Sequence, residues 1–419
     1  MRASPAAAAA LAAPRSSWRQ RGVARTRCAA APPSLPQSAW SPQPAQVERV
    51  SARELSPDEL AARCAAGGPL LVADAWPDLD GPAWLGRLVT QLGTRRVVYQ
   101  ARAPARTQRQ RCSPADAPPS SATIAQVQSS GETELFEGAL RDYLGEMVEE
   151  STHDAARFLF DEGALNGSPA LQLEPPPFAV GGAGDGFAAF PPPLRPAPCC
   201  LLAGGTGARS SLHADPYAWT GWNVLLEGEK LWTFLPPSAA AEEALQAVRK
   251  PPNAWGARGA DVAAGWESAV DLYRTRRTAA GEAGPAFAPS RPLPAWLEAS
   301  ATRCVQREGD LLLIPPATWH QTYHVGPTLA LAGQYLNAHN ARGVFGHMLT
   351  WCGAPDGAAE ALLARPELAA ASLQERVAAA LRAALAAKHG AAAADALLEA
   401  LWHDPPPKRS KRRTLNKTS

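Results

Sequence analysis

Over residues 48–150, short apolar runs typical of strands alternate with stretches that have the hydrophobic period of a helix. This pattern predicts an α/β segment that leads into the rest of the chain. Capping-box spacing and glycine pairs indicate where helices begin and end. The expected elements are a helix from Ser56 to Gly67, a strand at 69–74, a helix at 82–92, a strand at 96–99 and a helix at 134–150. Residues 101–131 are rich in Arg, Pro, Ser and Gln with almost no large apolar residues, so we expect a mobile loop there.

The region 343–403 has a helical pattern. Ser372 and Glu375 form a capping box, and Gly390 stops the helix that follows it. One face of this helix carries the apolar residues Leu373, Val377, Leu381 and Leu385. Such a stripe must be buried, so we expect it to pack within the chain of a monomer, with a homodimer as the alternative.

Short apolar runs bounded by glycine and proline fill the centre of the chain and predict strands. Side chains alternate along a strand, so His213 and Asp215 in an extended segment point the same way, with their Cα atoms roughly 6–7 Å apart. Both can therefore reach one metal ion.

A third ligand must come from another strand. The run Gly309–Pro316 predicts a turn, an apolar strand and a second turn, and the strand after it places His320, Thr322 and His324 on one face. Either histidine can complete a 2-His-1-carboxylate set, which holds a non-haem Fe(II) on one face and leaves its other positions open.

Composition agrees with an enzyme of two or three domains. The chain has 419 residues, 46% of them hydrophobic, and a net charge of +2, which does not indicate a nucleic-acid partner. Its seven cysteines include no C-x-x-C pair, which argues against a disulfide scaffold or a zinc module and favours a reducing compartment. No apolar run approaches the roughly 20 residues of a membrane span, so we expect no membrane association.

The two ends of the chain predict different cellular locations. Residues 1–47 contain six arginines and no acidic residue, which is typical of a plastid or mitochondrial transit peptide, or else of a disordered tail. Residues 404–419 form a basic tail whose cluster at 408–413 indicates the nucleus, or nucleic-acid contact through this tail alone. A solvated tail is the alternative here too.

The sequence around the candidate ligands resembles the Jumonji-C family of Fe(II)- and 2-oxoglutarate-dependent oxygenases, most of all its small protein hydroxylases. The successive family motifs are H-x-D-P at 213–216, Trp-Asn at 222–223, Gly-x-Lys-x-Trp at 228–232 and a Gly-Asp strand running into Pro and Trp-His at 309–320. The resemblance spans 157–337. It implies a mainly β fold with flanking helices, a double-stranded β-helix or cupin-like jelly roll over 151–342, with an insertion at 251–294 and a C-terminal helical segment.

The resemblance also implies roles for single residues. His213, Asp215 and His320 would bind Fe(II), and His324 would lie behind these ligands or line the pocket, with substrate contact as the alternative. The co-substrate 2-oxoglutarate would be held by Lys230, which pairs with its distal carboxylate, and oriented by Asn223 and Ser210; O₂ is the second co-substrate.

Two positions depart from the family pattern. Phe158 stands where relatives carry a tyrosine that can contact the 2-oxoglutarate carboxylate, and Ala332 stands at a position often polar. These changes imply weaker co-substrate binding, or compensation by a neighbouring hydroxyl or water. Trp222 and Trp232 are expected to build core. In the insertion, Trp255, Trp266 and Tyr273 are expected to pack onto the barrel, with a cover over the pocket mouth as the alternative.

The function implied is a dioxygenase that hydroxylates a side chain of a protein or peptide and releases succinate and CO₂. Demethylation of N-methyl-lysine or N-methyl-arginine is the alternative within the same chemistry. The same barrel could also be a catalytically silent binding module, or a cupin that uses another divalent metal without 2-oxoglutarate.

Overall fold

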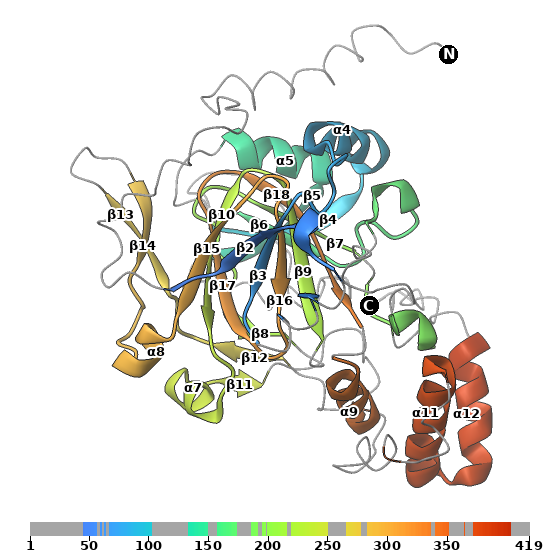
Figure 1. Ribbon diagram of the computed structural model, residues 1–419. Helices are drawn as coiled ribbons and strands as arrows, with labels where there is room; N and C mark the ends of the chain where they lie inside the picture. Colours follow the sequence, from blue (N-terminus) through green and yellow to red (C-terminus); the bar gives the residue numbers. More distant parts are fainter. Residues whose placement is uncertain are drawn as a thin grey trace, which may run out of the picture.

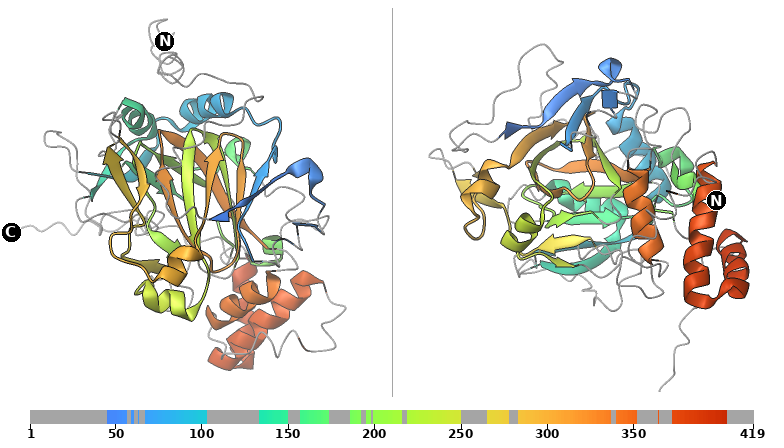
Figure 2. Two further views of the ribbon diagram at one scale, coloured as in Figure 1. Left: turned by 60° about the vertical axis from the view of Figure 1, so that its left-hand side comes forward. Right: turned by 60° about the horizontal axis from the view of Figure 1, so that its bottom comes forward.

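The structure is a computed structural model and is drawn in Figures 1 and 2. It describes residues 45–56, 59–60, 63, 67–102, 133–149, 157–173, 186–191, 195–197, 199–215, 219–249, 265–277, 283–336, 340–351, 364 and 372–403. The predicted transit segment and basic tail lie outside the described residues, apart from 45–47, as do Trp255 and all of the predicted loop except Ala101 and Arg102.

Two large β-sheets form the body of the molecule. The nine-stranded sheet has the order β2 (Glu48–Ser51), β3 (Leu70–Ala73), β16 (Leu311–Ile314), β9 (Thr220–Glu227), β18 (Thr328–Tyr335), β7 (Cys200–Gly204), β6 (Phe158–Asp161), β4 (Arg96–Arg102) and β5 (Thr133–Ala139). The seven-stranded sheet has the order β1 (Ala45–Gln46), β15 (Thr302–Arg307), β10 (Glu229–Leu235), β17 (Trp319–His324), β8 (Leu212–Ala214), β12 (Trp266–Ser268) and β11 (Val248–Arg249).

The middle of each sheet supplies four antiparallel strands of a double-stranded β-helix. These are β16-β9-β18-β7 in one sheet and β15-β10-β17-β8 in the other. From β7 to β10, and again from β15 to β18, the chain passes from one sheet to the other with each successive strand, which is the jelly-roll path. The predicted fold class is confirmed.

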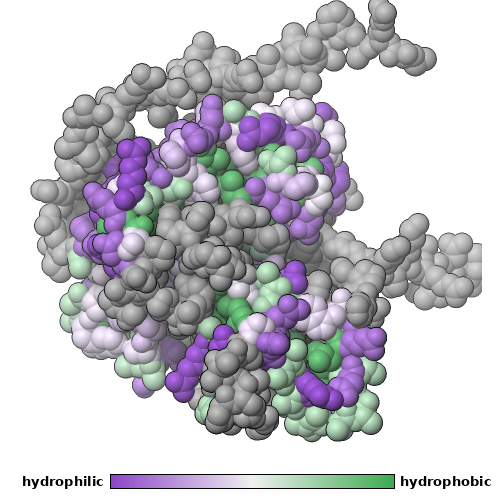
Figure 3. Space-filling view, turned by 45° about the vertical axis from the view of Figure 1, so that its right-hand side comes forward, coloured by the Kyte–Doolittle hydropathy of each residue, from purple (hydrophilic) through white to green (hydrophobic). Residues whose placement is uncertain are grey.

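Helices cover the outer faces of the sheets. α4 (Gly81–Leu92) and α5 (Leu140–Glu149) bury Trp84, Leu88, Tyr143 and Met147 in one core cluster with the nine-stranded sheet. On the other sheet, α7 (Ala239–Ala244), α8 (Ala295–Ala299) and the hairpin of β13 (Tyr273–Arg277) and β14 (Ala283–Phe287) contribute to a second cluster. On the face drawn in Figure 3, polar residues cover most of the described surface and strongly hydrophobic ones show in its hollows.

Three short 3₁₀ helices complete the described elements: η2 (Ala52–Glu54), η4 (Pro169–Leu171) and η5 (Gly186–Ala189). The capping box at Ser56 is present, because the Ser56 N–H donates to the Glu59 carboxylate and the Glu59 N–H donates to the Ser56 hydroxyl. Glu59, Leu60 and Arg63 are helical, as predicted.

The helix predicted at 134–150 is wrong in its first part. Residues 133–139 form the edge strand β5, paired antiparallel with β4, and the helix begins only at Leu140. Gly138 would have cost the helix about 1 kcal/mol, whereas in β5 Phe136 is buried and stacks on Tyr99 with ring centroids 6.0 Å apart. Cross-strand packing therefore outweighs the local helical pattern.

The C-terminal helices α9 (Ala341–Trp351), α11 (Leu373–His389) and α12 (Ala391–His403) lie together beside the barrel. The predicted capping box at Ser372 is present, and Val377 and Leu381 of the predicted stripe are buried in a cluster that also contains Phe187, Phe190 and Phe345. The stripe thus packs within the chain, as expected. No helix among the described residues is long and apolar enough to cross a bilayer.

Candidate metal centre and co-substrate pocket

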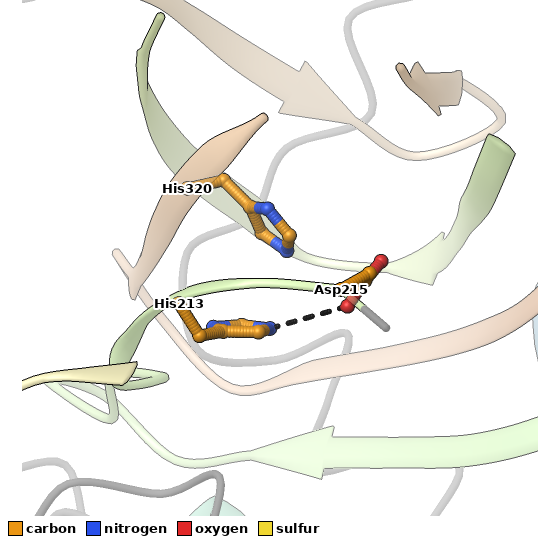
Figure 4. Close-up of side chains that lie close together, drawn as sticks. All are labelled: His213, Asp215 and His320. Carbon is orange, nitrogen blue, oxygen red and sulfur yellow. Dashed lines mark ion pairs between the residues drawn. The ribbon is translucent and has the colours of Figure 1, made fainter. Parts of the chain in front are cut away.

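The side chains of His213, Asp215 and His320 lie close together where β8 pairs with β17. His213 lies in β8 directly opposite His320 in β17, and Asp215 follows β8 immediately. His213 Nε2 is 3.6 Å from Asp215 Oδ1, and one ligand atom from each of the three residues lies within 4.8 Å of the others (Figure 4). Both histidines are buried and Asp215 is partly exposed.

Backbone carbonyls orient both imidazoles. His213 Nδ1 is 2.8 Å from the carbonyl oxygen of Ser211, and His320 Nδ1 is 2.9 Å from that of Thr318. A carbonyl can only accept, so each Nδ1 carries the proton, and the Nε2 of a neutral imidazole then has the lone pair that can bind a metal. This hydrogen bond on the far nitrogen is the usual support of a metal-binding histidine.

The donor set fits a non-haem iron. Two imidazole nitrogens and one carboxylate on one side suit Fe(II) with open positions opposite, whereas a purely sulfur or oxygen set would favour other metals. A Cβ on Gly221 would lie 3.2 Å from Asp215 Oδ2, so a larger residue there would crowd the carboxylate. Of the two histidines that periodicity alone left open, the structure brings His320 into the group, and His324 lies elsewhere.

One pocket connects this group to the predicted co-substrate residues. Its lining includes all six predicted site residues: Ser210, His213, Asp215, Asn223, Lys230 and His320. Along β10, Lys230 and Phe234 face the same way, and Phe234 pairs with His320 while Lys230 pairs with His324. The Cα atom of Lys230 therefore lies four residues, roughly 13 Å along the strand, from that of Phe234 at the metal end.

Lys230 is buried and has no anionic partner among the residues that the structure describes. Its side chain is 1% exposed, and it makes no ion pair with any described carboxylate. Burial lowers the pKa of Lys230 to about 7. An anion entering the pocket would pair with this ammonium and offset its desolvation.

Asn223 presents a second unmet polar group. Its side-chain Oδ1 is buried and has no hydrogen-bond partner among the described residues, and its paired neighbour in β18 is Ala332. Phe158 lines the same pocket, so both departures from the family pattern place apolar groups on its wall.

His324 is held away from the metal group in a niche of its own. A Cβ on Gly204 would lie 2.3 Å from His324 Nδ1, and the Thr328 hydroxyl lies 2.5 Å from the same nitrogen. Desolvation, helped by the charge of Lys230, lowers the pKa of His324 well below its ordinary value, against a hydrogen bond to the Gly204 backbone. The imidazole is therefore neutral at physiological pH.

The aromatic residues pack as expected. Trp222 is buried in the core and fills the space where Gly333 lacks a Cβ, and Trp232 stacks on Phe234 with centroids 5.8 Å apart. Both tryptophans also form part of the pocket wall. In the insertion, Tyr273 is buried and its hydroxyl lies 2.8 Å from that of Thr233, so it packs the insertion onto the barrel.

Sequence reasoning assigned no role to Thr322 or Gly204. Thr322 lines the pocket between the metal group and Lys230, and the two-residue period of β17 was the signal for it. No local signal marks Gly204, because its role depends on the ring of His324 from a distant strand.

A family of cupin-like domains matches residues 106–336, more than half of the chain. The chain belongs to this cupin-like, Jumonji-C family. Both the jelly roll and the His-Asp-His group agree with that membership.

Curated Jumonji-C relatives are similar over part of their length. The bifunctional arginine demethylase and lysyl-hydroxylase psr-1 of Caenorhabditis briggsae is 26% identical over 147 residues, 35% of this chain and 32% of the relative. The arginine-specific demethylase JMJ20 of Arabidopsis thaliana is 26% identical over 140 residues, 33% of this chain and 24% of the relative. The matches thus span about a third or less of these relatives.

We expect divalent-metal binding to depend on His320 and not on His324. Alanine at His320 removes an imidazole from the group, so Mn(II) affinity measured by calorimetry should fall at least tenfold, about 1.4 kcal/mol. His324→Ala is the matched control, being on the same face of the same strand, and should bind Mn(II) within about twofold of the wild-type protein. Equal losses in the two variants would contradict the assignment of His320.

Lys230 should make the stability of the protein depend on pH. Its pKa is about 7 when folded and about 10.4 when unfolded, so between these values the unfolded chain binds more protons and the folded state gains stability as pH rises. Below pH 7 the folded protein bears the whole free-energy cost of burying the charged lysine, and this cost decreases as the pH rises toward 10.

Urea denaturation of the wild-type protein and of Lys230→Met from pH 6 to pH 10 tests this. The wild-type free energy of unfolding should rise relative to that of the variant, by up to about 1.4 kcal/mol per pH unit. His324 stays neutral over this range and Gln306 on the other side of β10 is uncharged, so neither should mask the difference. Parallel pH profiles would contradict a depressed lysine pKa.

Proposed function

We propose that this chain is an Fe(II)- and 2-oxoglutarate-dependent dioxygenase that hydroxylates a protein side chain and releases succinate and CO₂. One observation carries the proposal: the two-histidine, one-carboxylate group lies in the same pocket as the buried Lys230, which has no ion-pair partner among the described residues. A metal alone explains the first feature. A co-substrate that reaches from the metal to a cation explains both.

The protein residues have distinct tasks in this proposal. His213, Asp215 and His320 would bind the metal through one face, with the carbonyl-bound Nδ1 atoms keeping both rings oriented. Bound iron, 2-oxoglutarate and O₂ supply the oxidation of a C–H bond, coupled to decarboxylation of the co-substrate. Lys230 would pair with the distal carboxylate, and the Asn223 amide would help to orient the molecule.

The pocket wall supports chemistry that must be shielded from water. Phe158, Trp222, Trp232 and Ile314 contribute apolar surface around the polar groups. Excluding water strengthens the pairing of Lys230 with a carboxylate and protects reactive species from side reactions. The pocket can thus bind a small dicarboxylate tightly with few polar contacts.

N-methyl demethylation is the second candidate function, and the names of the relatives support it. One is named a bifunctional arginine demethylase and lysyl-hydroxylase, and another an arginine-specific demethylase. Hydroxylation of an N-methyl group gives an unstable hemiaminal, so the same centre serves both reactions. A basic protein side chain is the substrate class that these names suggest for this chain.

Incubation of the protein with Fe(II), 2-oxoglutarate and extracted cell proteins tests the proposal. We expect succinate release and peptides that gain one oxygen atom, or lose one methylene unit in the case of demethylation. Asp215→Ala is the control, since it keeps the barrel but removes a ligand. Succinate release that is equal in this variant would contradict the role of the metal group, and no turnover by the wild-type protein on any extract would favour a silent binding module.

A further inference from the structure

Thr322 is one of the polar residues that line the pocket shared by the metal group and Lys230. Thr322 stands between His320 and His324 on the inward face of β17, and across the strand pair it faces Trp232, the inward neighbour of Lys230. It is therefore placed along the path that joins the metal to the ammonium. Phe158 and Ala332, which line the same pocket, have no hydrogen-bonding side chain.

Thr322 is tied to Ser210 by two reciprocal hydrogen bonds. The Thr322 N–H donates to Ser210 Oγ at 2.9 Å, and the Ser210 N–H donates to Thr322 Oγ1 at 3.3 Å. Both residues are more than nine-tenths buried, with exposures of 5% and 7%. In this arrangement each hydroxyl oxygen accepts from a backbone amide, and neither hydroxyl donates to any other described residue.

The hydroxyl protons are thus available to a ligand. A hydroxyl has one donor and two acceptor positions, so accepting a backbone hydrogen bond leaves the donor free. A carboxylate accepts at about four positions, more than the single ammonium of Lys230 fills in one geometry. Hydrogen bonds from a hydroxyl to a carboxylate are short and strong because the acceptor is charged.

We propose that Thr322 is a positioning residue for the acidic co-substrate, and that its hydroxyl, held in place by Ser210, donates to the carboxylate that pairs with Lys230. The inference rests on the proposed function. It explains how a pocket with apolar residues at Phe158 and Ala332 still satisfies a carboxylate: the donor is supplied from β17. A purely structural role, in which Thr322 only links β17 to the segment before β8, is the competing explanation.

Two ligands and two substitutions separate these explanations. The Mn(II)-loaded protein is titrated by calorimetry with 2-oxoglutarate and with 2-oxobutyrate, which keeps the 2-oxo acid end but lacks the distal carboxylate. Thr322→Val replaces the hydroxyl with a methyl group of similar size, and Thr322→Ser keeps the hydroxyl. Thr322→Ala serves if the valine variant does not fold.

We expect Thr322→Val to weaken 2-oxoglutarate binding about tenfold, or about 1.4 kcal/mol, and to leave 2-oxobutyrate binding within about twofold. Thr322→Ser should bind both ligands within about threefold of the wild-type protein. Mn(II) affinity should be the same in all three proteins.

Three results would overturn the inference. Unchanged 2-oxoglutarate affinity in Thr322→Val, equal losses for the two ligands, or equal losses in the serine and valine variants would each show that the hydroxyl does not contact the distal carboxylate. Wild-type protein that binds Mn(II) but neither ligand would instead overturn the proposed function. The two failures are therefore distinguishable.

Discussion

The pairing of His213 with His320 across β8 and β17 is the constraint on which the rest of the site depends. A strand that slips by one residue turns every side chain to its opposite face, so this register decides whether two imidazoles meet or point apart. The sheet is buried on both sides here, and the burial of Leu212, Trp319 and Tyr323 on the outer face opposes such a slip. Hydrophobic packing behind the sheet thus sets the geometry of the polar group in front of it.

The same register extends to the co-substrate end of the pocket. β10 lies beside β17, so the inward residues of both strands form matched rows that run from the metal group at His320 to the buried ammonium of Lys230. Burying that ammonium costs free energy because the charge loses its hydration. This cost lowers the pKa of Lys230 and opposes folding as long as no anion is bound. A bound dicarboxylate relieves this cost. In the proposed function, selectivity for an acidic co-substrate would follow from where the lysine is buried and from its lack of a described partner.

Much of the fold and of the candidate site could be predicted from the sequence, because the informative sequence patterns are local. The spacing of His213 and Asp215, the apolar run before His320 and the stripe through Val377 and Leu381 each describe one element, and the structure contains those elements. Non-local features could not be predicted in the same way. The choice of His320 over His324 depends on the pairing of His320 with His213 in another strand, and the Ser210–Thr322 link joins residues 112 positions apart. The helix expected at 134–139 was wrong for the same reason, since pairing with β4 outweighed its local pattern.

In the proposed function, the metal group and Lys230 belong to one co-substrate site. The most direct test is an anaerobic titration of the Fe(II)-loaded protein with 2-oxoglutarate, followed by the metal-to-ligand absorption band, for the wild-type protein and for Lys230→Met. Methionine keeps most of the apolar stem and removes the charge, and loss of one partner of a buried charge pair costs about 2–5 kcal/mol. We expect the band in both proteins, with at least a tenfold weaker apparent affinity for 2-oxoglutarate in the variant and unchanged iron binding. Coincident titration curves would contradict this expectation.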